Sequence, residues 1–403
     1  MIKQLLIGFY ICSIYIFSGY HYLLANNDLK IYNYNFLNYN TQSRLPVINF
    51  NKAIDFKYIK KISVSPSYTY KHITPNVVIN GDFAYTVDSN NFIITIDLER
   101  KKVVNRFKLP ASSPTLGLAF FEDSLYVSFE NGTIIAYSIV DKNVLWSIKL
   151  ITPVNSAPIV DENKLFLMAN NTVYAIDIYT GNVLWNYKGS TAGVSLKTIN
   201  SLTVYSGYVM VGISSSDVII LRKENGQLLW KENLNNMNLI NISANPLVGD
   251  IKAPITPIND KVLILANNKT IYMDLHSKTR EWQNNDYNTY QAPFIVGNIV
   301  YITDVYDNLL SINLKDGSLN WKVKLNTKKD AIGKTYWHSP LKMNGELMVS
   351  NSSGEVIFVS PKDGKELRYY ALYQNKREKI YHAPYVTSNN MIFISAKGNI
   401  YIL

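Results

Sequence analysis

Residues 175–185 read AIDIYTGNVLW, and this stretch is the most regular copy of a pattern that recurs along the chain. In each copy a turn is followed by a short run that ends in tryptophan. Successive copies lie 39, 45, 52 and 39 residues apart, by subtraction of their tryptophan numbers. A period of roughly 20 to 50 residues indicates a fold assembled from equivalent units. The five tryptophans are Trp146, Trp185, Trp230, Trp282 and Trp321.

Each unit contains four short strand-like runs. Residues 156–188 hold the apolar run SAPIV, the β-rich runs NKLFLMA and TVYAID, and the terminal run NVLWNYK, with polar or glycine residues between them. This order predicts a four-stranded antiparallel meander. The last hairpin turn of a unit needs a positive φ, which glycine supplies at Gly181, Gly226, Gly317 and Gly364.

The number of units sets the architecture. Seven units end at positions 105, 146, 185, 230, 282, 321 and 368. Residues 382–403 supply only three strands, and residues 58–64 (YIKKISV) have the character of the missing fourth. No stretch after residue 56 has a long helical period. We therefore predict an all-β fold over residues 56–403, an eight-bladed β-propeller of four-stranded antiparallel blades, with the ring closed by an N-terminal strand.

The five repeat tryptophans are predicted to be structural. They fall at the same place on the outermost strand, where a large ring can lie between neighbouring blades. The alternative is that they stack on a ligand. Asn105 and Arg368 occupy the corresponding places in two degenerate copies, so we expect weaker contacts between blades there.

The N-terminus carries a long apolar run. Residues 5–25 follow the positive Lys3 and precede the polar sequence NNDLK. This arrangement predicts that residues 1–25 are an export signal peptide or a retained membrane anchor. Residues 26–55, rich in Asn and Tyr, are interpreted as a linker. Cys12 lacks the small residues that precede a lipidated cysteine, so an ordinary apolar signal residue is the favoured interpretation.

Composition excludes several classes of protein. The chain has 403 residues, 47% hydrophobic and 17% charged, which is too apolar for a disordered chain. A single cysteine excludes a disulfide scaffold, a cysteine-ligated zinc site and, in the exported domain, a cysteine nucleophile. No metalloprotease, hydrolase or nucleotide-binding motif is present.

Two further groups of residues have modest signals. His338 and His382 each precede a small residue and proline, so they are predicted to be repeat positions at the start of inner strands rather than a metal pair. A basic stretch includes Lys322, Lys324, Lys328, Lys329 and Lys334. It is interpreted as a solvated loop of a chain with net charge +10, with an acidic partner or a membrane surface as alternatives.

Residues 175–185 resemble the AxDxxTGxxxW repeat of the quinoprotein-like propellers. That superfamily includes dehydrogenases that use pyrroloquinoline quinone and the family of the outer-membrane assembly lipoprotein BamB. Residues 56–403 are similar to the second in size and blade number, and residues 338–367 and 382–403 resemble its last two blades. The resemblance implies a non-enzymatic scaffold without cofactor in the Gram-negative periplasm, associated with the outer membrane. Its implied partners are the POTRA domains of the central assembly subunit and nascent outer-membrane proteins, and no nucleic acid.

The same resemblance implies an interface. Residues 193–201 (GVSLKTINS) are similar to the exposed segment with which that family contacts POTRA domains, and this indicates Leu196 and Lys197, with Val194 beside them. The acidic part of the interface corresponds to Asp250 alone, one residue out of register. The alternative is an ordinary transition from loop to strand.

Two other functions remain as alternatives. A quinone-dependent dehydrogenase would need calcium with acidic and amide ligands, and many members also use adjacent cysteines. Here the acidic residues fall mainly at turns, such as Asp97, Asp177 and Asp316, and no cluster has calcium-binding spacing. The second alternative is a propeller that binds a small ligand or peptide in its central channel.

Overall fold

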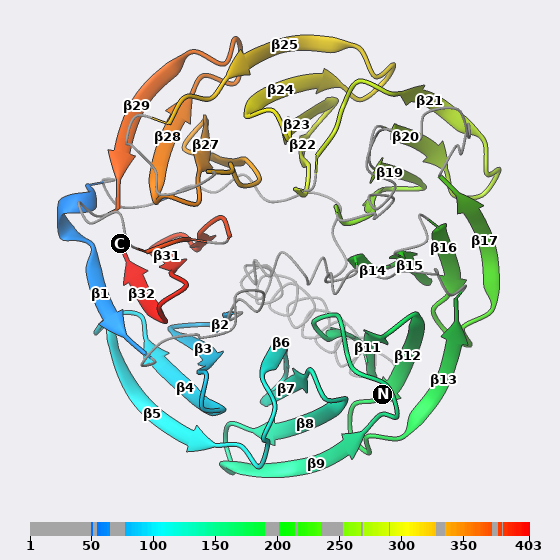
Figure 1. Ribbon diagram of the computed structural model, residues 1–403, viewed down its shortest axis with the longest axis vertical. Coiled ribbons are helices and arrows are strands. Elements are labelled where there is room, and N and C mark those ends of the chain that lie inside the picture. Colours follow the sequence, from blue (N-terminus) through cyan, green and yellow to red (C-terminus); the bar gives the residue numbers. More distant parts are fainter. Residues whose placement is uncertain are drawn as a thin grey trace, which may run out of the picture.

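The computed structural model describes residue 50 and residues 55–64, 77–189, 201–213, 217–234, 253–266, 269–289, 291–327, 335–372, 378–380 and 382–403. These residues form a ring of eight four-stranded antiparallel sheets, which confirms the predicted propeller (Figure 1). The described part of the chain contains one short 3-10 helix, η1 (Phe56–Tyr58), and no helix long and apolar enough to cross a membrane.

Blades 1 to 4 follow one another along the chain, and each begins with its inner strand and ends with its outer strand. Their strands are β2 (Val78–Asn80), β3 (Phe83–Val87), β4 (Phe92–Asp97) and β5 (Lys102–Lys108); β6 (Thr115–Phe121), β7 (Ser124–Phe129), β8 (Thr133–Ser138) and β9 (Asn143–Lys149); β10 (Ile159–Asp161), β11 (Lys164–Ala169), β12 (Thr172–Asp177) and β13 (Val183–Lys188); and β14 (Ser201–Tyr205), β15 (Tyr208–Gly212), β16 (Asp217–Arg222) and β17 (Leu228–Asn233).

Blades 5 to 7 repeat this order, and blade 8 takes its outer strand from the beginning of the domain. Their strands are β18 (Thr256–Ile258), β19 (Lys261–Ala266), β20 (Lys269–Asp274) and β21 (Arg280–Asn284); β22 (Phe294–Val296), β23 (Ile299–Thr303), β24 (Asn308–Asn313) and β25 (Leu319–Lys324); β26 (Leu341–Met343), β27 (Glu346–Ser350), β28 (Glu355–Val359) and β29 (Glu366–Ala371); and β30 (Tyr385–Val386), β31 (Met391–Ile394), β32 (Asn399–Ile402) and β1 (Lys60–Ser63).

Ring closure follows the predicted scheme. Strand β1 pairs antiparallel with β32, with Lys61 opposite Tyr401. Glu378 supports this joint because it accepts hydrogen bonds from Tyr401 and Asn399 and pairs with Lys61. Burial alone would raise the pKa of Glu378, but these hydrogen bonds hold it at about 2. The carboxylate therefore stays charged and holds the two ends of the domain together.

Burial explains why the middle and outer strands of a blade differ in sequence. The middle strands are covered on both faces by neighbouring blades, so β11 (KLFLMA) is buried at every position. The outer strand β9 (NVLWSIK) alternates between exposed and half-buried residues, because one face meets solvent. In seven blades the register shifts once between the third and outer strands, just before the outer strand crosses the tryptophan position.

The hydrophobic cores lie between blades rather than within them. One core joins Phe166 and Val173 of blade 3 to Val209 and Ile219 of blade 4, and all four are buried. Each blade is thus stable only beside its neighbours.

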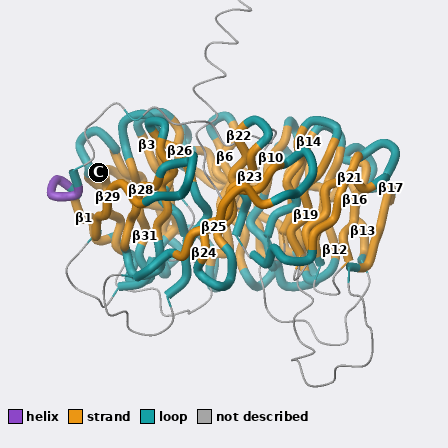
Figure 2. The backbone as a smooth tube through the Cα atoms, turned by 90° about the horizontal axis from the view of Figure 1, so that it is seen from above, coloured by secondary structure: helices purple, strands orange, loops and turns teal. Residues whose placement is uncertain are grey.

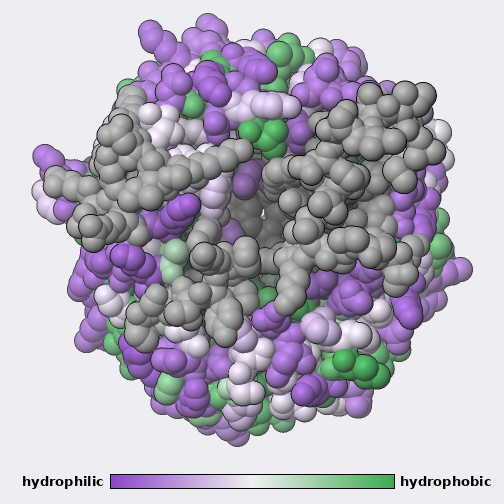
Figure 3. All heavy atoms as spheres, in the orientation of Figure 1, coloured by the Kyte–Doolittle hydropathy of each residue, from purple (hydrophilic) through white to green (hydrophobic). Residues whose placement is uncertain are grey.

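The side view shows a ring that is flatter than it is wide, with turns at both faces (Figure 2). Seen down the ring axis, the surface is mostly hydrophilic with separate hydrophobic patches (Figure 3).

One buried residue lies before the predicted start of the propeller. Phe50 falls in the stretch interpreted as a linker, and it is buried in the same core as Met343 and Tyr385. Its backbone N–H donates to Asn344 Oδ1 over 2.7 Å. The boundaries at residues 25 and 55 remain predictions, because most of the first 54 residues lie outside the described part of the chain.

Candidate functional site

The four residues predicted to contact a partner, Val194, Leu196, Lys197 and Asp250, lie outside the described residues. Strand β13 ends at Lys188 and β14 begins at Ser201, so three of them fall in the connection between blades 3 and 4. Asp250 falls between β17 and β18, in the connection from blade 4 to blade 5. Their place in an interface stays a prediction.

The repeat tryptophans lie on the outer strands, and four of them contact the following blade in the same way. The indole Nε1 of Trp185 donates to the backbone carbonyl of Lys223 in blade 4 over 3.0 Å. The equivalent bonds run from Trp146 to Ile178, from Trp282 to Leu314 and from Trp321 to Pro361, with lengths of 2.7, 2.8 and 3.2 Å. Each indole therefore connects its own blade to the last hairpin of the next.

The hairpin glycines have a second role that the sequence pattern alone did not reveal. Gly226 has φ +70°, and a Cβ at this position would lie 2.5 Å from Cε3 of the Trp185 ring. Gly181, Gly317 and Gly364 face Trp146, Trp282 and Trp321 in the same manner. Glycine is required both for the turn and for the close approach of the indole. The signal was present as a pairing of these four tryptophans with a glycine in the next unit.

Asn105 and Arg368 occupy the tryptophan register in blades 1 and 7. Thr95 and Phe358 are their partners on the third strands. The guanidinium of Arg368 lies 4.5 Å from the centre of the Phe358 ring, and Arg368 also pairs with Glu346. Blade 8, which follows blade 7, has strand β1 as its outer strand, so no hairpin connects its third and outer strands. An indole at residue 368 would therefore have no turn glycine to face.

Trp230 has the same register position but a different environment. Ile220 lies opposite Trp230, just as Ala175 lies opposite Trp185. In the next blade, however, the turn position of glycine is taken by Lys278, with φ 62°. Within the described residues, the indole of Trp230 donates no hydrogen bond to Leu275, the residue that corresponds to Lys223.

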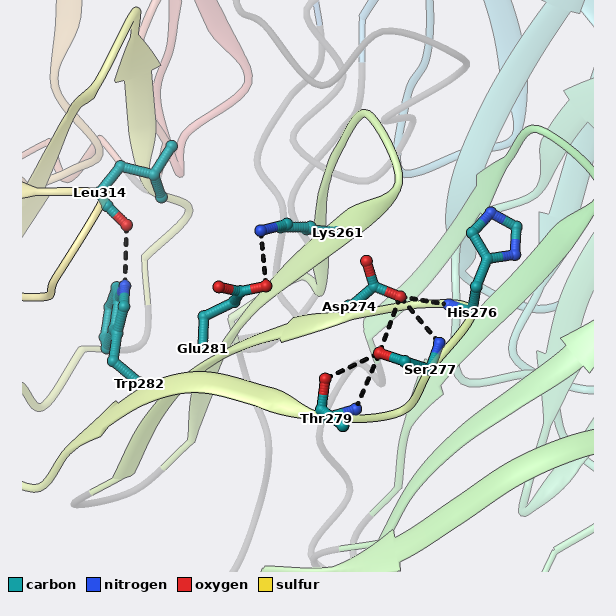
Figure 4. Close-up of polar contacts among 8 residues, drawn as sticks. All are labelled: Lys261, Asp274, His276, Ser277, Thr279, Glu281, Trp282 and Leu314. Carbon is teal, nitrogen blue, oxygen red and sulfur yellow. Dashed lines mark hydrogen bonds and ion pairs between the residues drawn. The ribbon is translucent and has the colours of Figure 1, made fainter.

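The turn aspartates stabilise the last hairpins. Asp274 accepts hydrogen bonds from the backbone N–H groups of His276 and Ser277, each 2.8 Å long, and from the Ser277 hydroxyl (Figure 4). These backbone hydrogen bonds lower the pKa of Asp274. Asp177 and Asp316 accept backbone N–H groups in the corresponding turns. This agrees with the interpretation of the acidic residues as turn formers.

Charged side chains add a second connection between blades 3 and 4. The Lys223 ammonium lies 2.8 Å from Asp161 and 3.2 Å from Glu162, across the blade boundary. Lys164 of blade 3 lies 3.2 Å from Glu224 of blade 4. Burial alone would lower the pKa of Lys223, but Asp161 and Glu162 raise it above its ordinary value. The Lys223 ammonium therefore keeps its positive charge at neutral pH.

The two histidines lie where the repeat places them, just before the inner strands β26 and β30. His338 is fully buried and His382 is partly buried, and burial lowers the pKa of His338 to about 3 and that of His382 to about 4. His382 contributes to the lowering at His338, and the Nδ1 atom of His338 lies 3.0 Å from the Ser350 hydroxyl. Both rings are neutral at physiological pH. The described residues contain no group of three or more potential metal ligands.

The predicted basic loop is only partly described, and its beginning is a strand. Lys322 and Lys324 lie on outer strand β25, where Lys324 donates to the backbone carbonyl of Tyr306. Lys328, Lys329 and Lys334 lie outside the described residues. The interpretation of all five lysines as one loop was therefore wrong for the first two.

These features define a class of protein. An eight-bladed ring with tryptophans that contact the next blade is a quinoprotein-like β-propeller. A model of the family described as outer membrane protein assembly factor BamB matches residues 89–323 and 288–403. The chain belongs to this family.

Individual relatives agree with this assignment. Outer membrane protein assembly factor BamB of Yersinia pestis is 20% identical, over 99% of this chain and 98% of that protein. The crystal structure of BamB from Moraxella catarrhalis has a TM-score of 0.68 at 12% identity and covers 85% of this chain and 98% of that one. Quinohemoprotein alcohol dehydrogenase ADHIIG from Pseudomonas putida HK5 has a TM-score of 0.60 at 11% identity, over 84% and 72%. These structural similarities show a shared fold.

Proposed function

We propose that this chain is a non-enzymatic scaffold of the outer-membrane β-barrel assembly machinery, located in the periplasm at the outer membrane of a Gram-negative bacterium. The family match, which extends from residue 89 to the C-terminal residue 403, supports this most strongly. The match to the Yersinia protein over nearly the whole of both chains adds to that support. Residues 1–25 would export or anchor the chain, and residues 26–55 would link them to the ring.

The proposed partner is the POTRA region of the central assembly subunit, bound through Val194, Leu196, Lys197 and Asp250. A rim residue that is apolar and flanked by a charge suits an interface of moderate size. The mechanism is positional, since the scaffold holds its partner without chemistry of its own.

Nascent outer-membrane proteins are the second proposed partner. Each outer strand ends its sheet, so its outward backbone edge has no strand paired to it in the described fold. Apolar side chains on these strands are exposed, including Leu184, Leu228 and Leu319. An unpaired edge beside apolar side chains supports transient addition of a strand from an unfolded barrel protein.

A pull-down tests the partner. The full chain carrying Leu196→Glu and Lys197→Glu is expected to lose binding to the POTRA region that the wild type retains. The matched control carries Leu184→Glu and Lys188→Glu on strand β13, which makes the same change of charge on exposed positions. Failure of the wild type to bind would remove the function, and wild-type binding by the first variant would remove the site.

An activity assay addresses the dehydrogenase alternative. The purified chain is mixed with pyrroloquinoline quinone and calcium, and reduction of a dye is followed with alcohols and sugars. We expect no turnover. Sustained dye reduction that depends on the quinone would contradict a non-enzymatic scaffold.

A further inference from the structure

The contact between blades 4 and 5 breaks the rule that the other tryptophan-bearing junctions follow. In four junctions a tryptophan faces a glycine of the next hairpin. Here Trp230 faces the turn that contains Lys278, whose φ of 62° is in the left-handed region. A lysine Cβ cannot lie where the glycines allow the indole to approach, because the corresponding Cβ positions fall 2.5 to 2.9 Å from the tryptophan rings.

Lys278 itself takes over the hydrogen bond that the indole makes elsewhere. Its ammonium donates to the backbone carbonyl of Leu275, the position equivalent to Lys223 in blade 4. The acceptor is therefore satisfied without the tryptophan, and the indole is not needed at this place. We call this contact the open junction, and the Trp185–Lys223 contact between blades 3 and 4 the closed junction.

A pocket of about 390 Å³ lies at the open junction. Leu229 and Arg222 contribute from blade 4, with the small turn residues Ser206 and Gly207 between them. Leu275 and Lys278 contribute from blade 5. The pocket thus combines two cationic side chains with an apolar wall and a turn that leaves room.

The closed junction shows what fills the same space elsewhere. The strand registers align Met210, Ile220 and Trp230 with Phe166, Ala175 and Trp185. Counting from this register, the turn residue Ser206 corresponds to Glu162, and both have positive φ. Glu162 and its neighbour Asp161 bring carboxylates to Lys223, within 3.2 and 2.8 Å. At the closed junction, therefore, two carboxylates of the chain itself meet a lysine of the next blade.

The open junction has neither Lys223 nor these carboxylates at the corresponding positions, but its pocket is lined by the cations Lys278 and Arg222. The positions of Asp161 and Glu162 are held by Tyr205 and Ser206, and no acidic residue is among the pocket's lining residues. Of the nearby acids, Asp274 accepts the N–H groups of its own turn, and Asp260 lies 3.7 Å from the ring nitrogen of His276. His276 also lines the pocket, and its ring points away from the Asp274 carboxylate (Figure 4). Burial lowers the pKa of Lys278, and the nearby Asp274 carboxylate, which acts in the opposite direction, does not offset this effect.

We propose that the pocket at the open junction binds a carboxylate side chain of an acidic peptide segment in a partner protein. The carboxylate would pair with Lys278 and Arg222 as Asp161 and Glu162 pair with Lys223. A neighbouring apolar side chain of the peptide would lie on Leu229 and Leu275.

A peptide is favoured over a free anion because of what adjoins the pocket. Leu229 lies on β17, the outer strand of blade 4, whose outward edge is unpaired and whose Leu228 is 43% exposed. A peptide that adds to this edge can place one side chain in the pocket. The pocket lies at the end of blade 4 that carries the β14–β15 and β16–β17 turns. Strand β14 begins and β17 ends at the opposite end of the blade. The proposal therefore concerns a second surface and does not depend on the POTRA interface.

Fluorescence polarisation of the full chain tests the proposal, with a fluorescein-labelled peptide of alternating Leu and Glu as the probe. We expect saturable binding that is at least about tenfold weaker for the peptide of alternating Leu and Gln. Lys278→Met should weaken binding of the acidic peptide by about tenfold. The matched control is Lys142→Met, which removes a lysine with φ 56° from the corresponding turn of blade 2, where no tryptophan is opposite. This control should bind as the wild type does.

Other outcomes would overturn the proposal. Equal binding of both peptides would show that the carboxylate is not recognised. Equal losses in the two lysine variants would show that only the chain's net positive charge matters. Displacement of the peptide by millimolar inorganic phosphate in the wild type and in Lys142→Met would indicate a general anion site rather than a peptide site. Lys278→Gly, which restores the residue of the other hairpins, guards against misfolding and should also lose the acidic peptide.

Discussion

The closed junction between blades 3 and 4 and the open junction between blades 4 and 5 are built from the same repeat, yet they differ in how they are held. At the closed junction Trp185 reaches the carbonyl of Lys223, and Lys223 is paired with Asp161. At the open junction Lys278 occupies the glycine position, and a pocket lies where the carboxylates would be. A repeat fold can thus lack the tryptophan–glycine contact at one junction and have a pocket there instead, because the contacts between the other blades still hold the ring together.

The largest expected difference concerns the two tryptophans. Trp185→Ala should lower the free energy of unfolding by about 3–5 kcal/mol and the Tm by several degrees, because a large, half-buried ring and its hydrogen bond are lost. Trp230→Ala should cost at least about 1 kcal/mol less, the net value of the hydrogen bond that it does not make. Thermal unfolding followed by circular dichroism measures both. Equal losses would remove the distinction between the two junctions.

Adding a methyl group to the closed junction should convert it toward the open one. Gly226→Ala places a Cβ against the Trp185 ring and a side chain at φ +70°, so we expect a loss of about 1–3 kcal/mol. Gly207→Ala is the control, since its φ is +89° but no atom lies within 4 Å of the added Cβ. If the two variants have the same Tm, the indole contact contributes nothing beyond backbone strain.

The reverse change should close the open junction. Lys278→Gly relieves a left-handed lysine and allows the Trp230 indole to approach, so we expect a gain of about 0.5–1 kcal/mol. Lys142→Gly relieves a similar backbone conformation without a tryptophan opposite, and it should gain less. Urea unfolding of both variants compares them, and a larger gain for Lys142→Gly would speak against an indole that is held off by Lys278.

The smallest expected effect is a difference in alkaline pH dependence. The pKa of Lys223 is raised, since Asp161 and Glu162 outweigh the effect of burial; its stabilising contribution is therefore complete below 10.5 and is lost as pH rises through the folded-state pKa. The pKa of Lys278 is lowered by burial, so its charged form costs stability below that pKa, and this cost fades as pH rises toward 10.5.

These opposite signs can be measured as Tm differences from the wild type between about pH 8 and pH 11. The advantage of the wild type over Lys223→Met should shrink as pH rises. The wild type should improve relative to Lys278→Met over the same range. Slopes of the same sign would contradict the assignment of the two lysines to different environments.

Much of the fold could be predicted from sequence because each blade is a local unit. Strand runs, polar turns and the spacing of Trp146, Trp185 and Trp321 report on contacts within one hairpin or its neighbour. Closure by residues 58–64 followed from counting strands, because the last unit was one strand short. The exposed and buried alternation of β9 was also visible in its sequence.

The amino-acid sequence by itself determined the all-β class, the eight units and the family to which the chain belongs, since these depend on periodicity and turn residues. The tertiary structure alone decided which carbonyl each indole reaches, why Gly226 must be glycine, and why Lys278 in the next unit leaves Trp230 unpaired among the described residues. These contacts join residues on neighbouring blades. The repeat aligns equivalent positions, but only the packing of one blade on the next brings a tryptophan and a turn within hydrogen-bonding distance.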